Sequence, residues 1–301
     1  MILTPKMRLF FFPVLSLPFA IYSCKPPTGV GSAPSFFNGK KPTEGVVATT
    51  IAMESVNDQG GLTSCSGVVI CTSKNSETNP NPDSTASGST KIYKTWILTA
   101  AHCVNKIEGR PVYIGPDKFN NKVQMCGIIK GFKHSNFIAD PKAFDLNDIG
   151  VALIACPQKP SCVPITAQKV PVGKNVIMAG YGFQGKVGEG KGGKNDDDSG
   201  YLMQGEGAVV PPTQAEVDAR VKGTEYRVQG AGTSHTNVGD SGGPLYVKAP
   251  NGSFILTGVL SRTTTENPDD PNAEVYSYFT AINPHLEWIQ SKIGSNVDTA
   301  R

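Results

Sequence analysis

The sequence predicts an all-β fold, a sandwich or a barrel, that ends in a single α-helix. Short apolar segments rich in Val, Ile and Thr recur between turn signals from about Val46 onward. The 301 residues include 33 Gly and 23 Pro, which favours many turns over long helices. Residues 284–293 differ, because their apolar side chains recur at helical spacing.

The first 23 residues are expected to be a signal peptide. Lys6 and Arg8 precede the apolar run Leu9–Ala20, which is too short for a typical transmembrane helix. We therefore expect an exported protein.

The end of this segment resembles a bacterial lipobox. It has the sequence Ile21-Tyr22-Ser23-Cys24, although Tyr22 departs from the usual small residue. An ordinary signal peptide is the alternative, but no Ala-x-Ala cleavage site is present. A diacylated Cys24 would anchor the chain to a bacterial membrane, in the periplasm or on the outer membrane, and the ordinary signal would give a secreted protein.

The rest of the chain has the composition of a globular domain. Residues 24–35 are rich in Pro, Gly and Ser and are expected to be a linker or propeptide. Without Lys6 and Arg8, the remaining 26 basic and 25 acidic residues give a net charge of +1. Such a balance gives no indication of a nucleic-acid partner.

Six cysteines remain after Cys24, and an even number in an exported chain suggests three disulfides. They are Cys65, Cys71, Cys103, Cys126, Cys156 and Cys162. A zinc site is not expected, because no Cys-x-x-Cys pair exists and the four histidines are scattered.

The predicted strands are interrupted by two polar inserts, and they are followed by the helix. Thr72–Thr90 and Gly185–Gly200 have the composition of surface loops. Asn283 can cap the helix at 284–293, with Pro284 in its first turn, and residues 295–301 are expected to be a tail.

Three short motifs carry residues of catalytic type. They are Thr99-Ala100-Ala101-His102-Cys103, Asn147-Asp148-Ile149-Gly150 and Gly239-Asp240-Ser241-Gly242-Gly243-Pro244. A serine hydroxyl needs an adjacent base, an imidazole can take and return its proton at neutral pH, and a buried carboxylate can orient that imidazole.

Together the motifs resemble those of the chymotrypsin-like serine proteases. The order His, Asp, Ser matches that family, and the separations are 148 − 102 = 46 and 241 − 148 = 93 residues. The glycine-flanked serine also fits the nucleophile elbow of α/β-hydrolases. That fold places the serine before the acid and the histidine, and it alternates strands with helices, so it is disfavoured.

The resemblance implies a complete architecture and a function. It implies two six-stranded antiparallel β-barrels packed together, over about 36–160 and 165–283, with the C-terminal helix completing a peptidase domain at 36–294. It also implies a monomeric endopeptidase that acts on proteins or peptides and needs no cofactor or metal. The alternatives are a catalytically inactive binding homologue and an esterase that uses the same residues.

The resemblance assigns a role to each residue of the motifs. Ser241 is the expected nucleophile, His102 the general base and then acid, and Asp148 the orienting carboxylate. The backbone N–H groups of Gly239 and Ser241 would form the oxyanion hole.

The resemblance also implies a first disulfide, Cys65–Cys103. Cys156 and Cys162 bracket a short step with two prolines and are expected to pair. This assignment leaves Cys71–Cys126 as the third bond.

In this family the base of the specificity pocket lies six residues before the nucleophile, at 241 − 6 = 235. His235 would occupy that base, and the walls and rim would be formed by Thr236, Ser261, Arg262, Thr263 and Ser277. We expect a shallow pocket for small or medium apolar side chains. A preference for Glu or Asp comes second, because His235 and Arg262 could supply positive charge. Arg and Lys are not expected to fit.

The resemblance finally predicts a zymogen. Phe36-Phe37-Asn38-Gly39 aligns with the mature N-terminus of the family, so cleavage before Phe36 would free an α-ammonium that pairs with Asp240. If Cys24 is lipidated, the same cleavage would release the domain from its anchor.

Overall fold

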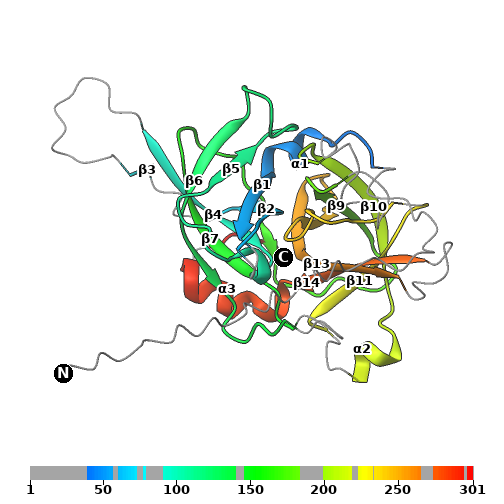
Figure 1. The fold of residues 1–301 in the computed structure, drawn as a ribbon. Helices are drawn as coiled ribbons and strands as arrows, with labels where there is room; N and C mark the ends of the chain where they lie inside the picture. The colour runs from blue at the N-terminus through cyan, green and yellow to red at the C-terminus, as the bar shows by residue number, and fades with distance from the viewer. Residues whose placement is uncertain are drawn as a thin grey trace, which may run out of the picture.

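The computed structural model describes residues 39–56, 60–72, 77–78, 91–139, 146–183, 199–218, 223–232, 234–265, 274–294 and 297–300. The predicted signal peptide, Cys24 and Phe36 lie outside these residues, as does most of both polar inserts. Two closed β-barrels lie side by side, with a helix at the C-terminal end of the chain (Figure 1). The predicted fold class is therefore confirmed.

The first barrel is closed by six antiparallel strands in the order β2-β1-β5-β6-β7-β4, with β4 pairing back onto β2. Val, Ile and Thr recur along these strands, and such β-branched side chains suit a pleated, half-buried surface. A short seventh strand, β3, extends the sheet beside β4. The strands are β1 (Thr50–Val56), β2 (Leu62–Ile70), β3 (Glu77–Thr78), β4 (Ile92–Thr99), β5 (Pro111–Ile114), β6 (Gln124–Lys133) and β7 (Gly150–Cys156).

The second barrel repeats this arrangement in the order β12-β9-β10-β11-β14-β13, with β12 pairing back onto β13. Two further strands, β8 and β15, lie parallel beside β13. The strands are β8 (Ile165–Thr166), β9 (Asn175–Gly180), β10 (Met203–Val210), β11 (Glu225–Gly230), β12 (Pro244–Lys248), β13 (Phe254–Thr265), β14 (Val275–Ala281) and β15 (Thr299–Ala300).

Helices are few and short. α1 (Glu44–Thr49) and α2 (Gln214–Asp218) were not expected from the sequence. The predicted C-terminal helix is present as a 3₁₀ turn, Asn283–His285, that continues into α3 (Leu286–Ile293). None of the described helices is long and apolar enough to cross a bilayer.

Residues 297–300, which were expected to belong to a tail, are part of the folded domain. Thr299 and Ala300 pair with β8, and Val297 is buried. The domain boundary at residue 294 was therefore placed too early.

The barrels meet along an apolar interface that includes side chains from both. Val68, Leu98 and Val151 of the first barrel belong to one buried cluster with Tyr246 and Val259 of the second. Burying this apolar surface is the main driving force that holds the barrels together. The contact fixes the relative position of loops that come from different barrels.

The disulfides correct two of the three expected pairings. Cys65 is bonded to Cys103, as the resemblance implied. The predicted bonds Cys156–Cys162 and Cys71–Cys126 are wrong, because Cys71 is bonded to Cys162 and Cys126 to Cys156. Cys126 and Cys156 lie on the neighbouring strands β6 and β7. Cys71 directly follows Ile70, which pairs with Val163 beside Cys162. Strand register therefore decided both bonds.

Candidate active site

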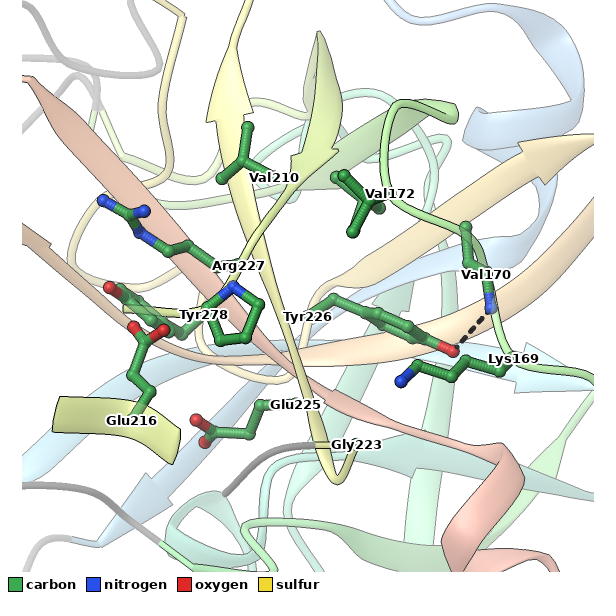
Figure 2. A pocket seen from close by; sticks show the side chains of 12 residues that line it. Lys169, Val170, Val172, Val210, Glu216, Gly223, Glu225, Tyr226, Arg227 and Tyr278 are labelled. Carbon is green, nitrogen blue, oxygen red and sulfur yellow. Dashed lines mark hydrogen bonds between the residues drawn. The ribbon is translucent and has the colours of Figure 1, made fainter. Parts of the chain in front are cut away.

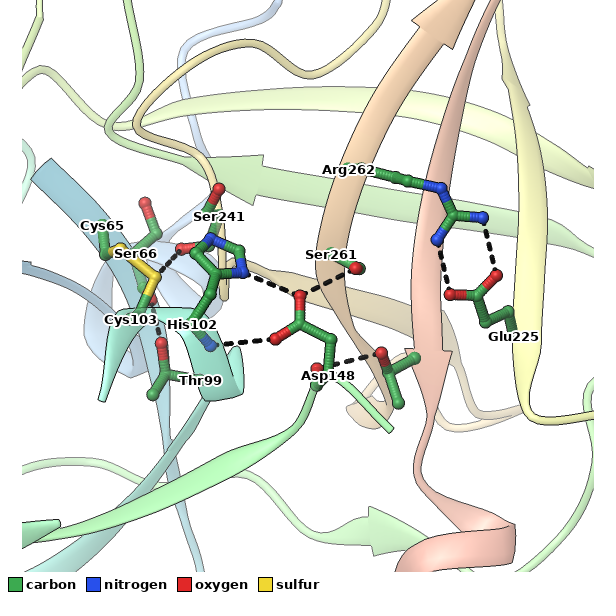
Figure 3. A network of polar contacts seen from close by, with 11 residues as sticks. Cys65, Ser66, Thr99, His102, Cys103, Asp148, Glu225, Ser241, Ser261 and Arg262 are labelled. Atoms are coloured by element: carbon green, nitrogen blue, oxygen red, sulfur yellow. Dashed lines mark hydrogen bonds and ion pairs between the residues drawn. A yellow bond between two sulfur atoms is a disulfide. The ribbon is translucent and has the colours of Figure 1, made fainter. Parts of the chain in front are cut away.

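The three motifs come together where the barrels meet. His102 lies in a 3₁₀ turn after β4, Asp148 lies two residues before β7, and Ser241 lies in the turn before β12. Figure 3 shows the His102 ring between Ser241 on one side and Asp148 on the other. The histidine and the aspartate thus come from the first barrel and the serine from the second.

Asp148 is completely buried and is held by three donors. The His102 ring approaches with Nδ1 2.7 Å from Oδ2, and the backbone N–H of His102 donates to Oδ1 at 3.0 Å. Ser261 Oγ donates to Oδ2 at 2.7 Å. Because a carboxylate only accepts, Nδ1 carries the ring hydrogen, and Nε2 is the ring nitrogen that can act as a base. The His102 side chain remains 35% exposed.

The backbone of Ser241 is fixed by contacts with both barrels. The Ser66 N–H donates to the Ser241 carbonyl at 2.7 Å, and the Gly242 N–H donates to the Leu260 carbonyl at 2.7 Å. Gly242 has φ +81°, and a Cβ there would lie 2.1 Å from Thr99 Oγ1. Glycine is therefore required beside the serine for both conformation and space.

The two N–H groups expected to form the oxyanion hole are oriented by hydrogen bonds to the carbonyl group that precedes each of them. The carbonyl of Val238 accepts from the Phe183 N–H at 2.8 Å, and the carbonyl of Asp240 accepts from the Gly243 N–H at 2.7 Å. In a planar trans peptide the N–H points away from the C=O. These bonds therefore direct the next N–H groups, those of Gly239 and Ser241, away from the protein interior. In the part of the chain that the structure describes, neither N–H donates to a protein acceptor.

Asp240 is a second buried carboxylate, and its described partners are two backbone N–H groups. Gly182 donates to Oδ1 at 2.7 Å and Asn237 donates to Oδ2 at 2.8 Å. Burial raises the pKa of Asp240 to about 7, although both hydrogen bonds lower it. Among the described residues, no cation pairs with this carboxylate.

The residues expected to line the specificity pocket occupy two different places. A cavity of about 340 Å³ beside Ser241 is lined by Arg262 and Thr263, but not by His235, Thr236, Ser261 or Ser277. Thr236 Oγ1 is 2.5 Å from Thr263 Oγ1 and donates to Ser277 Oγ at 2.8 Å. These contacts join Thr263, which lines the cavity, to Thr236 and Ser277, which do not.

His235 lies outside that cavity and is buried. Only 2% of the residue is exposed, and Nδ1 lies 3.0 Å from the Thr236 carbonyl. Burial lowers the pKa of His235, which favours the neutral ring. The expectations that His235 forms the pocket base and that Ser261 lines the pocket are therefore corrected.

Arg262 lines the cavity but is already paired. Its guanidinium makes a two-pronged ion pair with Glu225, at 2.6 and 2.8 Å, and stacks 4.3 Å from the ring centre of Tyr278. Burial raises the pKa of Glu225, while Arg262 lowers it. Glu225 also lines a separate cavity of about 200 Å³, which Figure 2 shows with Glu216 and Arg227.

Among the described residues, one group of possible metal ligands comes together. It consists of Cys65, His102 and Cys103. The two sulfurs are bonded to each other, so neither is a thiolate that could bind a metal.

The match to a family model now identifies the chain. The model of the family described as Trypsin matches residues 56–289, which is more than half of the sequence. The chain belongs to the trypsin family.

Individual relatives of this trypsin-family chain are distant. Serine protease SSP1 of Scolopendra subspinipes is 27% identical over 221 residues, covering 67% of this chain and 71% of that protein. Chymotrypsin-C of Rattus norvegicus is 27% identical over 222 residues, covering 68% and 77%. Transmembrane protease serine 11C of Mus musculus is 26% identical, and its match covers 69% of this chain but only 48% of that protein.

The sequence motifs of this trypsin-family chain did not reveal several residues that hold other site residues in place. Ser66 Oγ donates to the Gly239 carbonyl and accepts from the Tyr181 N–H. Phe183 and Glu225 were also missed. Ser66 stands next to Cys65, whose bond to Cys103 the resemblance implied, but no local signal in the sequence marks Phe183 or Glu225.

Gly242→Ala should reduce activity far more than Gly252→Ala. The two glycines have nearly the same φ, +81° and +83°, but nothing lies within 4 Å of a Cβ at Gly252. Both changes should cost about 1 kcal/mol of stability from φ strain, while only Gly242→Ala pushes against Thr99 and Ser66. Thermal unfolding and steady-state kinetics measure the two effects. Equal kinetic losses would contradict the steric argument.

Proposed function

We propose that this chain is a serine endopeptidase that cleaves peptide bonds through an acyl-enzyme intermediate. The observation that carries this proposal is the placement of His102 between the buried Asp148 carboxylate and Ser241. Family membership supports a peptidase, and the two outward-directed N–H groups beside Ser241 support stabilisation of an oxyanion.

The proposed reaction has two halves, acylation and deacylation, and each of these groups acts once in each half. Ser241 Oγ attacks the substrate carbonyl carbon while His102 Nε2 takes its proton, and the carbonyl oxygen becomes an oxyanion that accepts from Gly239 and Ser241. The C–N bond then breaks as His102 returns the proton to the leaving amine. Water attacks the resulting ester in the same way and releases the acid and free Ser241. Asp148 stays ionised and stabilises the imidazolium throughout.

Replacing the proposed residues tests the assignment directly. Ser241→Ala and His102→Ala should abolish casein turnover and leave thermal unfolding nearly unchanged, and Asp148→Asn should reduce kcat about 10⁴-fold because it favours the wrong histidine tautomer. A fluorophosphonate probe should label the wild type and not Ser241→Ala. A wild type that the probe does not label is an inactive homologue. A labelled wild type that cleaves esters but not casein is an esterase.

For substrate preference, we propose a small or medium apolar residue on the acyl side of the scissile bond. Thr263 lines the cavity beside Ser241 and contacts the Thr236 hydroxyl, and this hydroxyl bridge would limit how deeply a substrate side chain can enter. The ion pair with Glu225 compensates the charge of Arg262, which weakens the case for acidic substrates. A substrate Arg or Lys would lose its hydration without a partner carboxylate in the cavity lining.

Opening the hydroxyl bridge should change this preference. Thr263→Gly should raise kcat/KM for substrates with Phe at the acyl-side position relative to Ala by about tenfold or more, since a benzyl group gains burial. Thr264→Gly is the matched control, because Thr264 lines the same cavity without bonding to Thr236. Kinetics on a series of peptides that differ at this position measure the ratio. A wild type that prefers Arg or Lys would contradict the proposed pocket.

We also propose that the chain is exported, as a lipoprotein anchored through Cys24 or as a secreted protein, and that it is made as a zymogen. Cleavage before Phe36 would provide an ammonium group for Asp240. The support for this proposal is the raised pKa of Asp240, which lies directly before Ser241. Burial makes the negative charge of the Asp240 carboxylate unfavourable, and a cation beside it would stabilise the ionised form.

The precursor and the cleaved form should differ in how stability depends on pH. The folded pKa of Asp240, about 7, lies above its ordinary value of 3.8. The precursor should therefore lose stability, by up to about 4 kcal/mol, as the pH rises from about 4 through 7. In the cleaved form the ammonium lowers this pKa, and the loss should shrink. Urea unfolding at several pH values compares the two, with N-terminal sequencing of the active species. Full activity in a chain that begins at Cys24 would contradict the zymogen.

A further inference from the structure

Asn147, the residue directly before Asp148, has an unusual backbone conformation. Its φ is +55°, and in the described part of the chain only one other non-glycine residue, Lys106, has a positive φ. Residues other than glycine pay about 1 kcal/mol for this left-handed conformation. The turn is compact, because the Ile149 N–H donates to the Asn147 carbonyl at 2.8 Å. The orientation of Asp148 therefore depends on the conformation of Asn147.

The side chain of Asn147 is held at both ends. Its Nδ2 donates to the Asn136 carbonyl at 3.0 Å, which commits the amide nitrogen to that side. Its Oδ1 lies 3.0 Å from Nε2 of His285, which belongs to the 3₁₀ turn before α3. His285 therefore links the turn before Asp148 to the C-terminal end of the chain.

His285 is well placed to act as a rigid donor. It is only 4% exposed, and Nδ1 lies 2.7 Å from the carbonyl of Ala281. Both ring nitrogens thus face acceptors, since Asn147 presents its oxygen. A ring with a hydrogen on each nitrogen satisfies both contacts, and a neutral ring satisfies one.

Charge works against the doubly protonated ring. Burial lowers the pKa of His285, although the contact with Ala281 raises it. The His134 ring packs edge to face at 5.2 Å, and its own pKa is lowered by burial, by His285 and by Lys292. The hydrogen bond between His285 and Asn147 therefore depends on a hydrogen on Nε2. A side chain with a permanent N–H donor at the position of Nε2 would make the same contact.

We propose that His285 is a positioning residue for Asp148, and that it acts through Asn147. By donating to Asn147 Oδ1, it holds the left-handed turn that directs the Asp148 carboxylate between His102 and Ser261. This inference rests on the proposed function, because the group that it positions is the carboxylate proposed to orient His102. Neither His285 nor Asn147 lines the cavity beside Ser241, so the effect belongs to the chemical step and not to substrate binding.

Two amide substitutions at His285 separate its two contacts. The amide nitrogen of His285→Gln can reach the place of Nε2, next to Asn147, whereas that of His285→Asn reaches only the place of Nδ1, next to Ala281. His285→Asn should lower kcat by about three- to tenfold at unchanged KM, the value of one hydrogen bond. His285→Gln should retain most of kcat. Both variants remove the same ring, so general damage to the packing should affect them alike.

Asn147→Gly shows whether the effect passes through Asn147. Glycine accepts a φ of +55° without strain, so this change removes the side-chain contacts but not the backbone conformation. It should lower kcat about as much as His285→Asn, and the double variant should be no worse than either single one. This result is the double-mutant signature of one shared interaction.

A proton NMR measurement tests the inference without relying on turnover. The Nδ1 hydrogen of His102, bonded to the Asp148 carboxylate, should give a far-downfield resonance that is absent in His102→Ala. The resonance should weaken or shift in His285→Asn and Asn147→Gly and persist in His285→Gln, also in a Ser241→Ala background. If His285→Asn does not fold, the other two variants carry the test. Losses that are equal in the Gln and Asn variants, or additive in the double variant, would overturn the proposal. A failure of the proposed function would instead leave the resonances as expected and abolish turnover in the wild type.

Discussion

The buried charge of Asp148 is the constraint on which the arrangement of this domain depends. A carboxylate with no exposed surface is tolerated only when hydrogen bonds replace its water. His102 of the first barrel supplies two donors, and Ser261 of the second supplies the third. Thr280, also of the second barrel, binds the Asp148 carbonyl at 2.9 Å. The apolar interface brings the barrels together, but sliding one along the other would remove the hydrogen bonds that Ser261 and Thr280 make to Asp148. The polar contacts therefore select one docking position.

Hydrogen bonds likewise hold the groups around Ser241 in place. These bonds are made by backbone carbonyl groups and not by the N–H groups proposed to bind the oxyanion. The carbonyl oxygens of Val238 and Ser241 accept hydrogen bonds from other segments, and that of Asp240 accepts one from Gly243 in the same turn. In the proposed reaction, N–H donors held in this way would need no reorganisation when charge develops on the substrate. This is why the glycines around Ser241 matter more than their small size suggests. They allow the backbone to make these contacts at positive φ, where other residues are strained.

The parts of the molecule that the sequence predicted correctly are those encoded locally. Strand composition and the terminal helix each occupy a few consecutive residues, as do the three motifs that carried the family resemblance. The disulfides of Cys71 and Cys126 were mispaired because proximity in sequence was used where strand register decides. The same limit applies to the specificity pocket. The family resemblance placed Thr236 and Thr263 in the pocket wall, but it could not show that their hydroxyls meet or that His235 lies outside the cavity lining. Side-chain contacts across a barrel are set by the fold as a whole.

Comparing Asp148 with Asp240 shows how one fold gives two buried carboxylates different tasks. Asp148 accepts hydrogen bonds from three side-chain or backbone donors, two of them on His102 and one on Ser261. Asp240 has two backbone donors and a raised pKa, so its ionised form is incompletely stabilised. Gly180 and Gly182 leave the space for it, since a Cβ on either would lie within 2.7 Å of the carboxyl group. Asp240 shares a peptide bond with Ser241, and its own carbonyl orients the Ser241 N–H. A cation that arrives at Asp240 would therefore act on the oxyanion donors without touching the substrate. Asp240 is therefore a suitable position for an activating cation, because an ion pair formed there would contribute favourable free energy.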